Sequence, residues 1–256
     1  TTTTSMISCC FLEADMDPSI EVGAILKQIN GNYRIGKSEY FILESCEYKA
    51  NFLKFFPNAA VILNIDNDHL DYYKTFDNIV KTFDKFASLV DENGILVTNA
   101  DDENCVKLVN YTKAKFVTYG IINENANFLA KNIEFDNNGF AKFDVYKSKE
   151  LYMHVDLSVT GEHNVLNALA TIAICDYYKI DKNAIYNALN NFTGASRRLE
   201  YKGSFNDVSV FDDYAHHPTE ILSTAKAIKN KKYNESWVIF QPHTYSRTNE
   251  HLKAFA

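Results

Sequence analysis

Two acidic stretches carry side chains that could bind a divalent metal ion. Glu44-Ser45-Cys46-Glu47 follows a short apolar run at 40–43, and residues 64–71, N-I-D-N-D-H-L-D, follow another at 59–63. Carboxylate oxygens suit Mg²⁺, and the first stretch could reach a metal ion held by a hydroxyl at the start of a helix. The alternative for this stretch is a solvated acidic loop. The second stretch could be a hydrolase metal site, a helix N-cap with a surface histidine, or support for a second Mg²⁺.

The chain opens on a run of hydroxyl side chains, Thr1-Thr2-Thr3-Thr4-Ser5, that leads into an apolar stretch. This order matches the end of a phosphate-binding loop, G-x-x-G-K-T-T-T-T, in which Thr1 would offer its hydroxyl to Mg²⁺. The match covers the part of the loop after the lysine. A threonine-rich terminus or an ordinary helix cap is the competing interpretation.

Four further clusters of polar side chains follow along the chain. Residues 161–170 place a histidine and two asparagines at a helix start, where side-chain amides could read an adenine edge; a plain capped helix explains them equally well. Arg197-Arg198 could bind phosphate through a guanidinium or be a solvated basic pair. Residues 211–220, F-D-D-Y-A-H-H-P-T-E, run from a strand into a helix that begins with proline. Residues 241–248, Q-P-H-T-Y-S-R-T, follow a predicted strand at 237–240.

The elements that position these clusters alternate between strand and helix. Continuous apolar runs at 40–43 and 59–63 predict buried parallel strands, whereas the helical spacing of apolar residues at 76–90 predicts a helix. Further strands are predicted at 95–98 and 115–119. This alternation predicts a doubly wound α/β core of the P-loop type, in which a mostly parallel sheet is flanked by helices.

A different pattern begins near residue 128. Alternating residues at 128–157, with a turn at 135–140, predict a small antiparallel sheet attached to the parallel one. Helices are predicted at 161–178 and 181–191. After Arg198 a new strand–strand–helix–strand–helix series begins, so the pattern places a domain boundary near residues 193–200.

Composition narrows the class of protein. A formal charge of −7 argues against nucleic acid as the partner, and no apolar run approaches the about 18–20 residues of a membrane span. Five cysteines without a C-x-x-C pair indicate reduced thiols and a cytoplasmic location. Composition leaves the oligomeric state open.

Together and in this order, the six clusters resemble the Mur ligases, and among them the branch that joins L-alanine to UDP-N-acetylmuramate. The strings D-D-Y-A-H-H-P-T-E at 212–220 and Q-P-H-T-Y-S-R-T at 241–248 are highly specific. The threonine run and the asparagine-bearing helix match only the wider superfamily. The resemblance extends over the whole chain.

The resemblance implies ATP-dependent amide formation through an acyl phosphate, with ATP and Mg²⁺ as cofactors and UDP-N-acetylmuramate and L-alanine as substrates. It assigns 1–196 to the central ATP-binding domain and 197–256 to part of a Rossmann-like C-terminal α/β domain. The loop's glycines and lysine and a UDP-binding domain are not in this sequence. We therefore expect that residues 1–256 alone do not ligate.

The resemblance also implies a role for each candidate side chain. Thr1 and Glu47 would bind the first Mg²⁺ and His69 the second, with Glu47, His69 and His216 counted as catalytic. The residues implied for ATP are Thr1, Thr2, His163, Asn164, Asn167, Arg198 and Asp213. Those implied for the amino-acid pocket are Tyr214, His216, His243 and Arg247, whose guanidinium would pair with the alanine carboxylate.

Four other interpretations stay open on the sequence alone. Two use the same chemistry: a murein-tripeptide recycling ligase, in which 241–248 would be unexpected, and a folylpolyglutamate synthetase, which should lack the double histidine. A third is a fragment that binds nucleotide or metal without turnover. The last is a metal-dependent hydrolase built on Asp68, His69 and Asp71, which leaves the other clusters unexplained.

Overall fold

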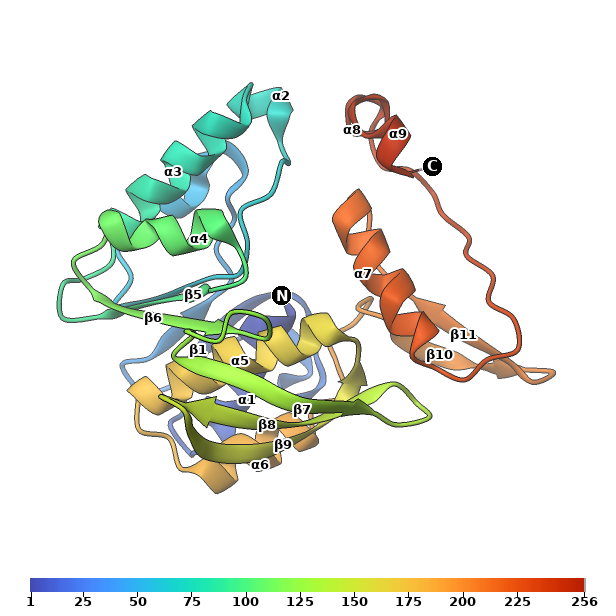
Figure 1. Cartoon of the computed structure of the whole chain (residues 1–256), viewed down its shortest axis with the longest axis horizontal. Helices are drawn as coiled ribbons and strands as arrows, with labels where there is room; N and C mark the ends of the chain where they lie inside the picture. Colours follow the sequence, from blue (N-terminus) through green and yellow to red (C-terminus); the bar gives the residue numbers. More distant parts are fainter. Residues whose placement is uncertain (256) are drawn as a thin grey trace.

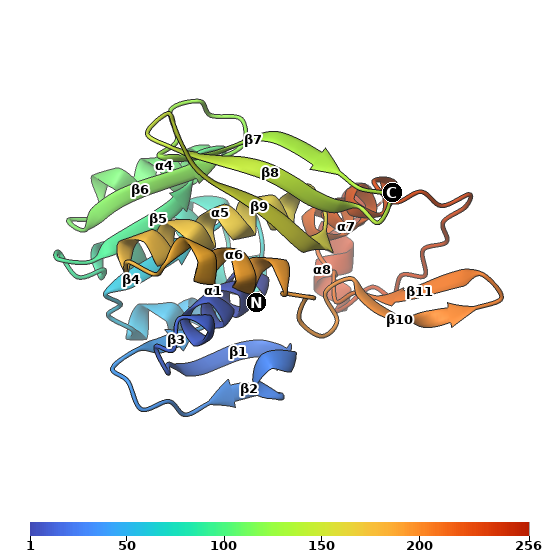
Figure 2. The ribbon, with the colours of Figure 1, turned by 90° about the horizontal axis from the view of Figure 1, so that it is seen from below.

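Three helices form the centre of the molecule, with a sheet on either side (Figures 1 and 2). A computed structural model describes residues 1–255. Helix α5 (Glu162–Tyr177) packs on the larger sheet, α1 (Thr2–Glu13) packs on α5 and on the smaller sheet, and α6 (Lys182–Asn190) packs on α1. Helices α1 and α5 are apolar around most of their circumference because neighbouring elements surround them.

The larger sheet has six strands in chain order from β4 to β9. Strands β4 to β7 are parallel, and β7, β8 and β9 form an antiparallel meander. The mostly parallel sheet with an attached antiparallel part is therefore confirmed. The bounds are β4 (Ala59–Ile62), β5 (Ile95–Asn99), β6 (Lys115–Gly120), β7 (Phe128–Phe135), β8 (Phe140–Lys147) and β9 (Glu150–Thr160).

The smaller sheet has the order β2-β1-β3, with β1 (Ser19–Leu26) antiparallel to β2 (Gly31–Arg34) and parallel to β3 (Phe41–Leu43). Strands β1 and β2 were not predicted. The run at 40–43 was expected in the same parallel core as the run at 59–63, and this expectation was wrong. Among the described strands, β3 pairs with β1 alone and β4 with β5 alone, so each has a free edge.

A cavity of about 840 Å³ separates the two free edges. Residues 40–43 line one side and residues 59–63 the other, and Ile7, Phe11 and Ile174 also line it. Because this cavity lies between β3 and β4, the two strands are too far apart to form backbone hydrogen bonds with each other.

Short helices cover the outer face of β4–β6. These are α2 (Leu70–Tyr73), α3 (Phe76–Ser88) and α4 (Glu103–Lys107), together with 3₁₀ turns at Tyr48–Lys54 and Leu108–Asn110. Helix α3 confirms the predicted helix, and its N-cap Thr75 accepts a hydrogen bond from the backbone N–H of Asn78. Ile79, Phe86 and Ala87 of α3 join Leu96 of β5 in a second apolar core.

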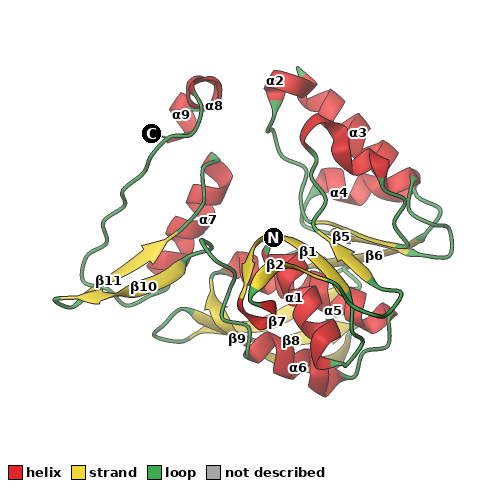
Figure 3. Ribbon diagram, turned by 180° about the vertical axis from the view of Figure 1, so that it is seen from behind, coloured by secondary structure: helices red, strands yellow, loops and turns green. Residues whose placement is uncertain are grey.

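The C-terminal part forms a separate group of elements (Figure 3). Strands β10 (Glu200–Phe205) and β11 (Val208–Asp212) pair with each other, and α7 (Pro218–Lys229), α8 (Tyr245–Glu250) and α9 (Leu252–Phe255) follow. The predicted strand at 237–240 is wrong. These residues lie in an extended segment in which Trp237 is 84% and Ile239 100% exposed, because no neighbouring strand pairs with them in the described part of the chain.

Within residues 1–255, no helix combines the length and apolar character needed to cross a bilayer.

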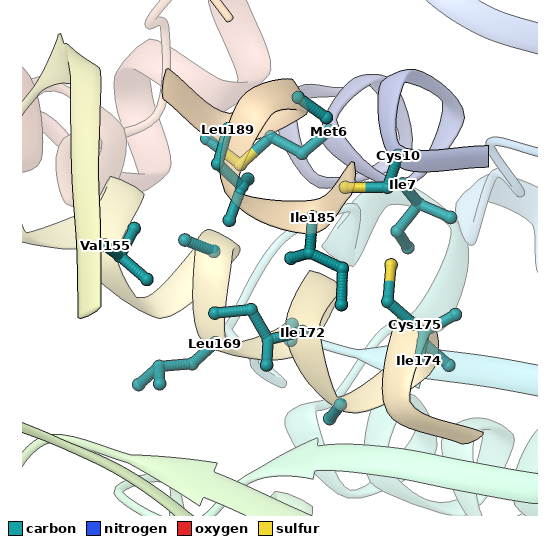
Figure 4. Packing of buried hydrophobic residues seen from close by; sticks show 14 of the residues in the cluster. Met6, Ile7, Cys10, Val155, Leu169, Ile172, Ile174, Cys175, Ile185 and Leu189 are labelled. Atoms are coloured by element: carbon teal, nitrogen blue, oxygen red, sulfur yellow. The ribbon is translucent and has the colours of Figure 1, made fainter. Parts of the chain in front are cut away.

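The central core predicts which substitutions weaken the fold. Ile172 of α5 is fully buried beside Leu169 and Ile185 (Figure 4), whereas Ile122 is 80% exposed. We expect Ile172→Ala to lower the free energy of unfolding by about 2–5 kcal/mol, because it removes buried methyl groups and leaves a cavity. Ile122→Ala should change it by less than about 0.5 kcal/mol. Urea denaturation of both variants tests this, and equal losses would contradict the packing described.

Candidate functional site

The loops after β3 and β4 bring Glu47 and His69 into contact. Oε1 of Glu47 lies 3.0 Å from Nε2 of His69, although these side chains follow strands of different sheets. His69 has a left-handed backbone conformation (φ 59°) where it begins α2, and its ring lies 4.8 Å from that of Tyr48. The Tyr73 hydroxyl donates to the Glu47 carbonyl oxygen. The His69 ring is therefore held by both Glu47 and Tyr48, and the Glu47 backbone is held by Tyr73.

This contact shifts the pKa of both groups. The hydrogen bond from His69 lowers the pKa of Glu47, against burial, which raises it. The same hydrogen bond raises the pKa of His69, supported by the charges of Asp68 and Glu47 and opposed by burial. A carboxylate that stays ionised is a suitable ligand for a divalent cation.

Thr1 lies at the same cavity but contacts a different carboxylate. Its hydroxyl donates to Oε1 of Glu44 at 2.5 Å and accepts from Nη2 of Arg198 at 3.0 Å. Thr1, Glu44, Glu47 and His69 all line the 840 Å³ cavity. Glu44 lies in the predicted acidic stretch but had no individual role. It could have been weighed equally with Glu47, since both follow the same strand.

The two asparagines of α5 are bonded to the protein. Asn167 accepts from the Thr3 hydroxyl at 2.9 Å and donates to Oδ1 of Asn164 at 2.9 Å, and Asn164 donates to the carbonyl of Thr160 at 2.8 Å. This chain of hydrogen bonds joins the start of α1 to the start of α5. Thr3 was not singled out, and its partner lies 164 residues away in the sequence.

His163 is folded back at the start of α5. Gly161 has φ 95°, and a Cβ there would lie 2.6 Å from the His163 ring, so the close approach requires glycine. Burial lowers the pKa of His163, and the charge of Asp213 opposes this. The carboxylate of Asp213 accepts the backbone N–H groups of Leu199 and Ala215.

The C-terminal candidates form two groups. Tyr214 and His216 have ring centroids 4.9 Å apart, and His216 and His243 have centroids 5.9 Å apart. Arg247 lies elsewhere, with Nη2 3.1 Å from Oδ1 of Asp68. The expected pocket residues Tyr214, His216 and His243 are thus neighbours, whereas Arg247 contacts the loop that carries His69. Thr2 lies in the first turn of α1.

The side chains beside the cavity include ligand types that Mg²⁺ accepts. Mg²⁺ needs few protein ligands when waters and phosphates supply the others, and a hydroxyl, a carboxylate and an imidazole are available here. The Asp71 carboxylate accepts from the Tyr48 hydroxyl, and Asp68 is paired with Arg247. Among the described residues, no three histidines, cysteines or acids converge as metal ligands.

Two family models match the chain: the Mur ligase middle domain over residues 1–175 and the Mur ligase, glutamate ligase domain over residues 197–256. The chain belongs to the Mur ligase family.

Several relatives and solved structures resemble the whole chain. UDP-N-acetylmuramate–L-alanine ligases of Clostridium acetobutylicum and Clostridium perfringens are 52% and 47% identical, over 97% and 100% of the chain and 54% and 56% of their own lengths. The crystal structure of UDP-N-acetylmuramate-alanine ligase from Thermotoga maritima is similar with a TM-score of 0.83 and 31% identity, covering 99% of this chain and 57% of that one. The chain spans about half the length of these relatives.

The Glu47–His69 contact predicts a pH-dependent stability. Because the pKa of His69 is raised in the folded protein, His69 stabilises the fold fully when the pH is below its pKa in the unfolded chain. This stabilisation is lost as the pH rises through its pKa in the folded protein. Because the pKa of Glu47 is lowered in the folded protein, Glu47 stabilises the fold fully when the pH is above its pKa in the unfolded chain. This stabilisation is lost as the pH falls through its pKa in the folded protein. His69→Gln should therefore lower the melting temperature most between about pH 4.5 and 6.5.

Melting curves of both proteins from pH 4 to 9 measure this effect. The difference in melting temperature should shrink above the folded pKa of His69. A difference that stays constant up to pH 9 would contradict the electrostatic origin of the contact.

Proposed function

We propose that the longer protein to which this chain corresponds ligates L-alanine to the carboxylate of UDP-N-acetylmuramate, with ATP as the energy source. The observation that carries the proposal is the 3.0 Å contact of Glu47 with His69 beside the Thr1 hydroxyl. The names of the relatives at about 50% identity support this choice of substrates. The location we propose is the cytoplasm, in keeping with five free cysteines, four of them buried.

This chain offers side chains that would bind the metal ions and the nucleotide. Glu47 and the Thr1 hydroxyl would hold one Mg²⁺ and His69 a second; bound there, the ions would neutralise charge on the transferring phosphoryl group. Arg198, whose guanidinium already reaches the Thr1 hydroxyl, would add positive charge near the phosphates. His163, Asn164 and Asn167 would border the adenine and Asp213 the ribose. Since Asn164 is bonded to Thr160 and Asn167, its adenine contact would require one of these bonds to yield.

The chain's own residues mainly position the reactants. An acyl phosphate would form when the substrate carboxylate attacks the γ-phosphorus and ADP leaves. The alanine amine would then attack the acyl carbon, lose a proton and displace phosphate; neither step needs a protein nucleophile. Tyr214, His216 and His243 would line the amino-acid pocket, and Arg247 would pair with the alanine carboxylate.

We propose domains at 1–196 and 197–256, since β10 and β11 pair only with each other in the described range.

The cavity between β3 and β4 supports the phosphate-loop interpretation of Thr1. Glu47 and His69, which contact each other, lie in the loops that follow β3 and β4. The residues just before the two strands both contact Tyr178: Tyr40 through its ring, and Asn58 by accepting a hydrogen bond from the Tyr178 hydroxyl. The two strands therefore run in the same direction with two free edges facing one cavity. We propose that a strand of the longer protein fills this space and leads through the loop into Thr1.

A nucleotide-binding fragment without turnover remains a second candidate for residues 1–256 alone. The chain spans 54% of the length of the Clostridium acetobutylicum relative, and turnover would require several preorganised donors at the phosphates. We expect no UDP-N-acetylmuramate-dependent ligation by this chain, and turnover by the longer protein.

Substitutions in the longer protein test the function. Glu47→Ala or His69→Ala should lower alanine-dependent phosphate release by about 10²–10³-fold, the usual cost of losing one preorganised group at a developing charge. Asp71→Asn is the matched control, because Asp71 lies in the same acidic stretch but bonds to Tyr48; it should change the rate by less than about threefold. A protein indifferent to alanine would contradict the substrate, and a severe loss in Asp71→Asn would revive the hydrolase interpretation.

A further inference from the structure

Three consecutive residues of the loop after β4 contact the C-terminal part of the chain. Asp66 accepts from the Thr219 hydroxyl at 2.6 Å, and the carbonyl of Asn67 lies 3.2 Å from Nε2 of His217. Asp68 pairs with Arg247. The loop is therefore a docking platform for the C-terminal part, and it ends at His69.

The Asp68–Arg247 pair is the charged contact of this platform. Nη2 of Arg247 donates to both carboxylate oxygens of Asp68, at 3.1 and 3.3 Å. The Asp68 and Arg247 side chains are only 29% and 13% exposed. Oδ1 of Asp68 also accepts the backbone N–H of His69 at 2.7 Å, which fixes the carboxylate relative to the loop.

This geometry leaves another donor of the same guanidinium without a partner. Nε of Arg247 is buried and has no hydrogen-bond partner in the described part of the chain. A buried donor without a partner is costly and is satisfied when a ligand supplies an acceptor. A guanidinium has five N–H donors in a fixed fork, so one carboxylate on Nη2 still leaves the Nε side for a second carboxylate.

We infer that Asp68 is a positioning residue, which holds the Arg247 guanidinium so that its Nε side receives the carboxylate of the amino-acid substrate. This inference rests on the proposed function. Asp68 itself does not touch the amino acid; it acts across the boundary between the two parts of the chain. Since Nε is closed off from solvent, the amino acid reaches it as α8 and its neighbouring segment move, in keeping with the domain closure of such ligases.

The experiment measures steady-state kinetics of the longer protein with alanine and ATP varied in turn. Asp68→Asn keeps an acceptor for the His69 N–H but removes the charge from Arg247. We expect the KM for alanine to rise by about tenfold or more, as when outer partners of metal ligands are removed, and the KM for ATP to stay within about twofold. Asp66→Asn is the matched control, because Asp66 also bonds across the boundary but does not contact Arg247; both KM values should stay within about twofold.

A double substitution separates positioning from a general loss of docking. Arg247→Lys keeps the charge but loses the planar fork, so it should also raise the KM for alanine. If Asp68 acts through Arg247, the Asp68→Asn/Arg247→Lys protein should be little worse than Arg247→Lys alone. The inference would be overturned if the rise in the KM for alanine in the double variant equalled the product of the rises in the two single variants. It would also be overturned if Asp66→Asn and Asp68→Asn raised that KM equally.

The outcomes also separate the inference from the proposed function. An unsubstituted protein that releases no phosphate in response to alanine would refute the function itself. Normal alanine-dependent turnover in Asp68→Asn, or a KM for ATP that rises as much as that for alanine, would refute only the role of Asp68. Melting temperatures of each variant show whether a kinetic change reflects lost folding.

Discussion

The contact between Glu47 and His69 joins two sheets that share no backbone hydrogen bond among the described strands. β3 and β4 each present a free edge to one cavity, so their relative position depends on the helices packed beside them and on contacts between the loops at their ends. A carboxylate and an imidazole from different sheets meet there with opposite pKa shifts. The lowered pKa keeps Glu47 an ionised oxygen ligand suited to Mg²⁺, whereas His69 would bind a metal ion only after losing its proton.

Helices α1 and α5 provide the support for that point. They pack on one another through fully buried side chains, including Cys10 of α1 and Cys175 of α5, whose sulfur atoms face each other (Figure 4). Their first turns are joined by the hydrogen bonds from Thr3 to Asn167 and from Asn167 to Asn164. A displacement of α5 would therefore be transmitted to the start of α1, where the Thr1 hydroxyl lies. Hydrogen bonds thus connect the starts of α1 and α5, and the Glu47–His69 contact connects the loops after β3 and β4, all around the same cavity.

Much of the fold could be predicted because local pattern determined it. Helix α3, strands β5 and β6 and the β7–β8 hairpin follow from apolar spacing, a stop at Gly94 and a turn sequence. β1 was missed although its polar and apolar residues alternate from Ser19 to Val22, because Gly23 interrupts that short strand pattern. The strand at 237–240 was wrong because an apolar run becomes a strand only when another strand pairs with it.

The site could be predicted only in part. Glu47 and His69 follow predicted strands, and the ends of parallel strands are where ligands bind in open α/β sheets, so their proximity could be expected. The pairing of Arg247 with Asp68 spans 179 residues and depends on how the C-terminal part docks, for which the sequence carries no local signal. The role of Asn164 in bonding Thr160 was hidden for a related reason, since a side-chain amide suits an adenine edge and a backbone carbonyl equally well.

The most direct measurement of the central claim is a crystal structure of the longer protein with Mn²⁺ and a non-hydrolysable ATP analogue. Mn²⁺ prefers the same oxygen-rich ligands as Mg²⁺ and can be located by its anomalous scattering. The account predicts Mn²⁺ beside Glu47 and the Thr1 hydroxyl, with His69 at a second ion and the nucleotide phosphates between them. Ordered nucleotide with Mn²⁺ bound away from both Glu47 and His69 would contradict it.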